Sequence, residues 1–473
     1  MTVSAASTGK IPPAMYMRIV AAVAAVAGGL YGYDTGIISG ALPQIAADFQ
    51  LTYRGQELVT ASILLGAVVG ALSCTRLSAR LGRRLTIMIV AGIYCVGVVA
   101  AALAPNAWAL GLARLVLGFA VGGSTQIVPT YIAELAPPDR RGSLVTFFNV
   151  SIGVGILLAA IVGVAGHDLF TWRWMFGVAV VPSGFLFLAM VWMPRSPRWL
   201  IEQHHPRRAA HELEKVRDTA REVRAEVSDI QEVVERMNEQ PVTGWRAMAQ
   251  PWVRPALVAG LGVAAFTQLS GIEMMIYYTP TFLKDAGFGP QAALWSALGV
   301  ALAYLVMTFA GKMVVDRMGR RALSLFMIPG AIVALLVLGA VLQFGLAGAA
   351  RPWWVVACLI VFMIFNSGGI QVVGWLTGSE IYPLAIRDQA IGAHAAMLWG
   401  SNLLLTGTAL SVTTALGVGG AMWLYAGLNA LGWLFIFRLV PETGGRSLED
   451  IERSLKDGSF LPRGAGAKTA SAS

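Results

Sequence analysis

Charged residues are scarce in this sequence, and their scarcity excludes a large class of proteins. Only 13% of the 473 residues are charged, against roughly 25% in a typical soluble domain, whereas 56% are hydrophobic. The mean hydropathy of +0.66 points the same way. This composition excludes an ordinary soluble domain. It predicts an all-α polytopic membrane protein, because a helix satisfies its own backbone polar groups in lipid.

The sequence also lacks the signatures of a metal site, a disulfide framework and an ATP-driven enzyme. The three cysteines, Cys74, Cys95 and Cys358, show no CxxC spacing, which such frameworks and zinc sites use. There is no GxxxxGK[ST] phosphate loop, which a P-loop ATPase needs, and no recognisable catalytic triad. We therefore expect no metal, no cofactor and no enzymatic activity.

Positive charge is in excess, with a formal net charge of +9. The basic residues gather in alternate loops between apolar segments, as the positive-inside rule describes, so we expect no nucleic-acid partner. This asymmetry predicts a plasma (inner) membrane protein with both termini in the cytoplasm. The loops predicted to be cytoplasmic carry Arg80, Arg83, Arg84, Arg140, Arg141, Arg317, Arg320, Arg321 and Arg387.

Twelve apolar segments are long enough to span a bilayer, for which about 20 residues suffice. They form two sets of six: 17–43, 57–76, 85–105, 109–134, 143–166 and 174–193, then 254–282, 291–314, 322–346, 353–381, 388–414 and 418–440. The predicted divisions are an N-terminal cytoplasmic tail (1–16), a six-helix half (17–194), a cytoplasmic helical linker (195–253), a second six-helix half (254–440) and a C-terminal cytoplasmic tail (441–473).

The linker contains apolar residues three and four positions apart between Leu213 and Val234. That spacing predicts an amphipathic helical stripe. Because the stripe is short, helices lying on the cytoplasmic end of the bundle are favoured over a coiled coil.

The two halves repeat each other's landmarks. An Arg-x-Gly-Arg-Arg motif follows the second and eighth segments, with Gly82 and Gly319 at its centres, 237 positions apart. Glu134 and Glu380 end the fourth and tenth segments, 246 positions apart. Such a repeat predicts a transporter, with its substrate site at the midplane between the halves.

One acidic residue, Asp34, lies inside the first apolar segment. A carboxylate at bilayer depth is costly unless it is paired, neutralised or hydrated, so it marks a candidate functional site. Asp34 is about 200° around the helix from the nearest glycines of a small-residue stripe, which favours close helix packing. One face can therefore pack tightly while another presents the carboxylate to a cavity. The stripe consists of Gly28, Gly32, Gly36 and Gly40.

Motifs along about 17–452 resemble those of the sugar porter family of the major facilitator superfamily, which includes bacterial sugar–proton symporters and glucose facilitators. They include GYDTGIISGAL (32–42), PTYIAELAPPDRRG (129–142), SPRWL (196–200), YYTP (277–280), DRMGRR (316–321), SEIYPLAIR (379–387) and PETGGRSLEDIE (441–452). The resemblance implies the twelve-helix fold of that superfamily, in two pseudo-symmetric halves, and transport by alternating access without ATP.

The resemblance also implies that Asp34 accepts a coupled proton and that Arg114 is its partner. Protonation of the carboxylate weakens its attraction to the guanidinium and so alters the gap between the two helices. A static ion pair that only joins the first and fourth spans is the alternative. A second acid, Glu273, stands where the family usually has Asn. It has four possible roles: binding vicinal hydroxyls, pairing with a cation, holding a second proton or bonding to another helix.

For the substrate site, Gln268, Trp375, Trp399 and Asn402 match family positions, and Asn149 stands where a longer Gln is usual. The predicted site also includes Tyr31, which shares the face of Asp34, and Thr267 and Glu273, from a stretch that departs from the family pattern. Several neighbours depart from the family pattern. Tyr304 replaces an Asn, Leu398 a frequent Gln, and Gln371 and Val372 the usual Gly-Pro, which adds a polar group and removes a hinge. These departures leave the substrate open among hexoses, pentoses, polyols and modified sugars.

The family pattern further implies salt-bridge networks and gate residues that latch the outward-facing state. Ala79 stands where the family usually has Asp, so we expect a weaker latch in the first half. The implied gate residues are Arg83, Arg84, Glu134, Arg141, Tyr277, Tyr278, Asp316, Arg317, Arg320, Arg321, Glu380 and Arg387.

Together these features predict proton-coupled symport of a monosaccharide or polyol. The expected partners are the sugar, the proton and the lipid bilayer, and we expect the monomer to be the functional unit. Two alternatives remain, facilitated diffusion without coupling and a non-transporting nutrient sensor. The sensor is disfavoured because sensors usually carry long cytoplasmic tails.

Overall fold

The chain forms a twelve-helix membrane bundle, which confirms the predicted fold class. The computed structural model describes residues 12–137, 140–166, 169–238, 245–285, 287–346, 348–446 and 448–462. Eleven helical segments in these ranges are long and apolar enough to cross a membrane, and α17 (Arg387–Thr406) completes the layout. Large apolar side chains such as Val96, Leu112 and Phe309 are exposed on the outside, as lipid contact requires.

The first half contains six spans. They are α1 (Pro13–Asp48), α2 (Tyr53–Leu81), α3 (Arg83–Ala102), α4 (Ala107–Leu135), α5 (Arg141–Gly166) and a sixth made of α6 (Trp172–Gly177) and α7 (Val180–Met190).

The second half contains several broken spans. Its seventh span is α11 (Arg254–Leu269) followed by α12 (Ile272–Asp285), and its tenth is α15 (Arg351–Ser367) followed by α16 (Ile370–Glu380). The long helix α18 (Ala409–Leu439) bends at Gly417, whose φ is +75°, so its first residues extend the eleventh span. The remaining helices of this half are α13 (Pro290–Met318), α14 (Arg320–Phe344) and the short η3 (Gly348–Ala350) and η4 (Leu384–Ile386).

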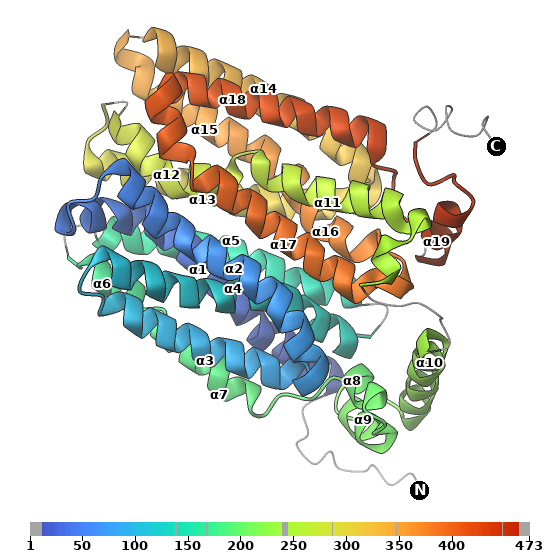
Figure 1. Cartoon of the computed structure of the whole chain (residues 1–473). Helices are drawn as coiled ribbons and strands as arrows, with labels where there is room; N and C mark the ends of the chain where they lie inside the picture. Colours follow the sequence, from blue (N-terminus) through green and yellow to red (C-terminus); the bar gives the residue numbers. More distant parts are fainter. Residues whose placement is uncertain are drawn as a thin grey trace, which may run out of the picture.

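The two halves lie side by side along their length, and the linker helices lie at one end (Figure 1). We call this the linker end and the opposite end the far end. Both described termini of the chain are at or near the linker end (Figure 1). The short helices there are α8 (Pro197–Glu202), α9 (Pro206–Leu213), α10 (Ala220–Asn238), η1 (Ala247–Ala249), η2 (Pro251–Val253) and α19 (Leu448–Lys456).

The linker is divided between the two halves. Leu213, Val216 and Val223 are buried in the same apolar cluster as the first half, and Arg217 donates to the carbonyl of Leu135 at the end of α4 at 2.9 Å. By contrast, Val253 is buried in a cluster of the second half together with residues of α19. The helices α8–α10 therefore belong with the first half, whereas η2 and α19 belong with the second.

The predicted amphipathic stripe is not one continuous helix. Helix α9 ends at Leu213 and α10 begins at Ala220. The residues between them turn so that Val216 and Arg217 reach the first half. The helices lie on the end of the bundle, as expected.

The glycine stripe of α1 packs against α5. A Cβ added at Gly36 would lie 2.7 Å from the Cβ of Ala159, and one at Gly40 would lie 3.0 Å from the Cα of Gly163. At Gly32 an added Cβ would overlap the carbonyl of Ile152. The predicted close contact is therefore real, and it fixes the rotation of α1 about its axis.

Candidate functional site

Two helix breaks in the second half lie beside the interface between the halves. Gly271, with φ +94°, separates α11 from α12, so Glu273 comes in the first turn of α12. Gly368 and Gly369 separate α15 from α16. Gln371 and Val372 lie inside α16, so the helix is not broken where they replace Gly-Pro; the span is broken instead just before them, at these two glycines.

Four side chains from both halves meet next to the break at Gly271. The hydroxyl of Tyr31 on α1 donates to Oε1 of Glu273 at 3.1 Å, and its ring meets Trp399 edge to face, with centroids 5.1 Å apart. Trp399 Nε1 in turn donates to Oγ1 of Thr125 on α4 at 3.4 Å. This cluster, which we call the central cluster, joins α1 and α4 to α12 and α17 across the interface.

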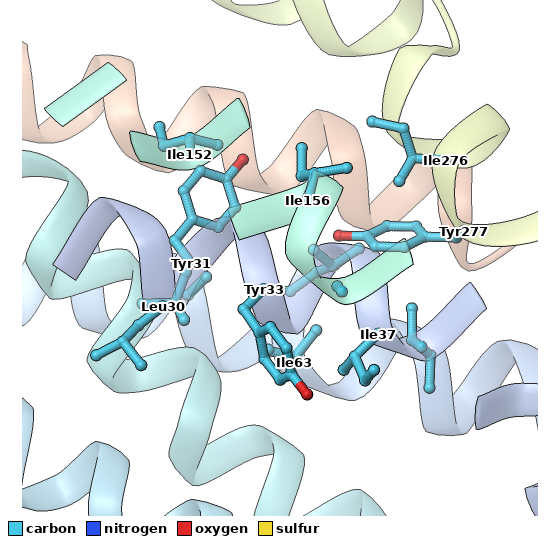
Figure 2. Packing of buried hydrophobic residues seen from close by; sticks show 14 of the residues in the cluster. Leu30, Tyr31, Tyr33, Ile37, Ile63, Ile152, Ile156, Ile276 and Tyr277 are labelled. Carbon is cyan, nitrogen blue, oxygen red and sulfur yellow. The ribbon is translucent and has the colours of Figure 1, made fainter. Parts of the chain in front are cut away.

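Different faces of α1 contact different neighbouring helices (Figure 2). Tyr31 lies beside Ile152 of α5, and Tyr277 reaches toward α1 from the second half (Figure 2). Tyr33 points the other way, beside Ile63 (Figure 2), and donates to the carbonyl of Met175 at 2.6 Å. The face that carries Tyr31 is thus the one turned to the second half.

Asp34 and Arg114 lie within the first half and are almost completely buried. Their closest charged atoms are 3.9 Å apart, with exposed fractions of 3% and 0%. Arg114 uses its Nε to donate to the carbonyl of Val59 at 2.9 Å. Oδ2 of Asp34 and both terminal nitrogens of Arg114 make no hydrogen bond within the described residues. The pair is therefore held by charge, without a direct hydrogen bond.

The predicted substrate residues fall into two groups. Tyr31, Glu273 and Trp399 form the central cluster. Gln268 and Asn402 are also buried, and each keeps a polar atom with no partner among the described residues, Oε1 of Gln268 and Nδ2 of Asn402.

Asn149 and Trp375 lie in a hollow between α5, α13 and α16, whose lining also includes Tyr304 and Gln371; Tyr304 is near Glu273 of the central cluster. The Thr267 hydroxyl donates to the carbonyl of Val263 in its own helix at 2.7 Å, so it is already engaged. The structure brings Tyr31, Glu273 and Trp399 into contact and places Asn149 and Trp375 in the lining of one hollow.

The far end is closed by contacts that the sequence reasoning missed. Glu57, near the start of α2, accepts hydrogen bonds from both the backbone N–H and the hydroxyl of Ser411 of the second half, each at 2.6 Å. Its carboxylate therefore sits on the first turn of α18, where a negative charge is favoured. Close by, the hydroxyl of Tyr278 donates to the carbonyl of Thr406 at 3.3 Å. Glu57 is the first residue of the predicted span 57–76, at its edge, so the rule that singled out the mid-span Asp34 did not find it.

A second buried group was also missed. His394 on α17 is 3% exposed. Its Nε2 lies 2.9 Å from the carbonyl oxygen of Gly374, and its Nδ1 lies 3.0 Å from the hydroxyl of Tyr382. These contacts fix α16, which carries Trp375, against α17.

Salt bridges brace the linker end of the first half. Arg83 contacts Glu134 at 2.9 Å, and Ser196 donates to the other oxygen of that carboxylate at 2.5 Å. Glu202 of α8 lies 4.0 Å from Arg83, and Arg84 donates to the carbonyl of Met193 at 2.9 Å.

The second half repeats this arrangement. Arg320 contacts Glu380 at 2.7 Å and Asp316 at 2.9 Å, while Thr443 donates to Glu380 at 3.1 Å. Glu442 adds a cap, accepting from the backbone N–H of Arg320 at 2.7 Å. These contacts correspond in the two halves, since Arg83, Glu134 and Ser196 occupy the places of Arg320, Glu380 and Thr443.

The remaining predicted gate residues are placed less centrally. Arg321 donates to the carbonyl of Phe437 at 2.8 Å, and Arg387 donates to that of Ser379 at 3.0 Å. Arg317 is exposed. The side chain of Arg141 lies outside the described residues.

Comparison with known proteins agrees with this architecture. A family model described as sugar (and other) transporter matches residues 20–455. A putative metabolite transport protein, YwtG of Bacillus subtilis (strain 168), is 38% identical over 433 residues, covering 92% of this chain and 94% of that protein. The galactose-proton symporter of Escherichia coli (strain K12) is 35% identical over 443 residues, covering 93% and 94%. Among solved structures, the proton:xylose symporter XylE bound to 6-bromo-6-deoxy-D-glucose is 26% identical and superposes with a TM-score of 0.80, covering 93% of this chain and 98% of that one.

Proposed function

This chain belongs to the sugar (and other) transporter family of the major facilitator superfamily, and from that premise we propose that it is a proton-coupled symporter of a monosaccharide or polyol. It is an integral membrane transporter rather than an enzyme. The observation that carries the proposal is the central cluster. Its aromatic and acidic side chains join the two halves next to the helix break at Gly271, and its Tyr31 lies on α1, the helix that carries Asp34 of the buried acid–arginine pair.

The chemistry of the interface suits a ligand rich in hydroxyl groups. Oε2 of Glu273, Oε1 of Gln268 and Nδ2 of Asn402 are buried polar atoms without a hydrogen-bond partner among the described residues. Leaving such atoms unpaired is costly, and a polyhydroxylated ligand supplies both donors and acceptors for them. Trp399, held in place by Tyr31 and Thr125, offers an aromatic face for the C–H groups of a sugar.

The Asp34–Arg114 pair supports proton coupling. Protonation of Asp34 removes one of the two opposite charges, and without a direct hydrogen bond nothing else among the described contacts holds the two side chains together. Because Arg114 also binds the backbone of α2, its release changes the packing of α1, α2 and α4. That change is the step by which a proton alters the balance between the two transport states.

The placement of the contacts supports alternating access. We propose that the far end is periplasmic and the linker end cytoplasmic, with both termini inside. The Glu57–Ser411 contact then closes the outer gate, while the Arg83–Glu134 and Arg320–Glu380 networks brace the inner ends of each half. The monomer contains every element of this cycle.

Uptake by proteoliposomes against a panel of sugars and polyols, with and without an imposed pH gradient, tests the proposal. We expect accumulation of at least one compound above its external concentration only when the outside is acidic. Uptake that stops at equal concentrations under both conditions would instead establish facilitated diffusion.

The Asp34→Asn variant separates coupling from binding. We expect it to lose accumulation driven by the pH gradient and to keep exchange of internal for external sugar, because exchange requires no net proton movement. Intact pH-driven accumulation in this variant would show that the pair is only structural.

A further inference from the structure

A lysine lies inside the membrane-spanning part of α13 and lines the hollow that holds Asn149 and Trp375. Helix α13 presents Tyr304, Thr308 and Lys312 to this hollow at four-residue intervals, so the three share one helix face. We call the hollow the lysine pocket. Its lining is Asn149, Ile152, Tyr304, Thr308, Lys312, Gln371, Val372, Trp375 and Leu376.

Lys312 has no counter-ion in the part of the chain that the structure describes. Among these residues no carboxylate lies within 4.0 Å of it, and no other charged side chain lines the pocket. Glu273 is not the counter-ion of Lys312. Glu273 lies near Tyr304, and Tyr304 is eight residues from Lys312, which is about 12 Å along α13. An unpaired ionisable group at this depth is costly and marks a functional site.

The rest of the pocket supplies hydrogen bonds and an apolar wall. The side chains of Thr308 and Gln371 lie there beside the hydroxyl of Tyr304, with Oγ1 of Thr308 and Oε1 of Gln371 buried, and Asn149 adds an amide from the first half. Trp375 forms one side. The ammonium group of Lys312, the Thr308 hydroxyl and the Asn149 amide can each donate a hydrogen bond to a carboxylate, and Oε1 of Gln371 can accept one from a sugar hydroxyl.

We propose that the lysine pocket is a subsite for an anionic group, and that the preferred substrate is a sugar acid whose carboxylate binds Lys312. This inference rests on the proposed function, because it concerns the substrate of the same interface. The hydroxylated body of the substrate lies toward the central cluster, and the carboxylate lies toward the linker end. The simpler alternative is that the lysine only extends its ammonium toward water at the membrane surface, in which case it has no effect on selectivity.

Competition binding to the purified full-length protein tests the subsite with matched pairs. The pairs are D-glucuronate with D-glucose and D-galacturonate with D-galactose, which differ only in the carboxylate. We expect at least one acid to bind about tenfold or more tightly than its neutral parent, as a charge-assisted hydrogen bond predicts. In Lys312→Met the ratio of the two affinities should fall by about the same factor, and Lys312→Arg should retain most of it.

Lys284→Met is the matched control, since Lys284 is an exposed lysine at the end of α12 and should leave the ratio unchanged. Equal binding of acid and neutral parent by the wild-type protein, or an unchanged ratio in Lys312→Met, would overturn the subsite. If either result is obtained while the protein still binds the neutral sugar, only the subsite is refuted, and the proposed sugar transport is not. If no sugar, sugar acid or polyol binds or is taken up, the proposed function and the subsite both fail.

Discussion

The contact between Glu57 and Ser411 makes a quantitative prediction about the far-end gate. Both oxygens of the buried carboxylate accept hydrogen bonds from the other half at 2.6 Å. When the gate opens, these bonds break and the carboxylate becomes hydrated. The Glu57→Gln substitution keeps the size of the side chain but removes its charge, so it should destabilise the closed gate selectively.

The expected size follows from the two bonds. A charge-assisted hydrogen bond contributes about 1.5–3 kcal/mol, roughly twice a neutral one, and the amide retains neutral bonds in place of both. The substitution should therefore cost the closed gate about 1–3 kcal/mol, which corresponds to a shift of about 5- to 150-fold in the ratio of open to closed gates. Ser411→Ala removes one of the two charge-assisted bonds completely and leaves the other, so it should give a shift of similar size.

The assay is labelling of a cysteine at position 61 by a membrane-impermeant maleimide. Ala61 is 8% exposed and faces Gly407 of the second half, where an added Cβ would lie 3.3 Å from that of Ala61. An Ala61→Cys reporter, in a background with Cys74, Cys95 and Cys358 replaced by serine, is therefore reached only through an open gate. We expect faster labelling in Glu57→Gln in proportion to the open fraction.

A second reporter makes the result interpretable. The side chain of Leu103, at the far end of α3, is 74% exposed. A Leu103→Cys reporter should therefore be labelled at the same rate in every variant. An unchanged rate at position 61, with position 103 labelled normally, would refute the assignment of Glu57 to the gate.

Two further predictions concern packing and the inner networks. Gly32→Ala should lower the free energy of unfolding by about 1–3 kcal/mol, because the added Cβ overlaps Ile152. The control Gly29→Ala should be tolerated, because its Cβ would lie 3.7 Å from the Ser151 carbonyl oxygen. Thermal unfolding in detergent compares the two variants, and equal melting temperatures would contradict the packing argument. Glu380→Gln should change the ratio of open to closed gates, measured by the same position-61 labelling, more than it changes equilibrium sugar binding. The reason is that Glu380 contacts Arg320 and Thr443 at the linker end. A loss of sugar affinity with no change in labelling would count against a gating role for Glu380.

Much of the architecture was predictable because lipid imposes simple rules on sequence. Runs of apolar residues indicated the spans, and the repeated Arg-x-Gly-Arg-Arg motif indicated two equivalent halves. That symmetry extends to the contacts, since Arg83–Glu134 and Arg320–Glu380 occupy corresponding places. The cost of a buried charge pointed to Asp34, which the structure places 3.9 Å from Arg114.

The parts that were missed depend on contacts between helices far apart in the sequence. Glu57 meets Ser411 over a separation of 354 residues, and no local pattern announces that pairing. The break before α16 lies at Gly368 and Gly369, two glycines that the sequence reasoning did not single out. The linker stripe was misread because apolar periodicity does not show where a helix stops.

Proton movement during sugar entry tests the central claim most directly. Proteoliposomes containing a trapped pH-sensitive dye, with equal pH on both sides, receive a transported sugar on the outside. Symport predicts that sugar entry acidifies the interior, and that Asp34→Asn abolishes the acidification while exchange continues. Sugar entry without any acidification would contradict proton coupling and identify a facilitator.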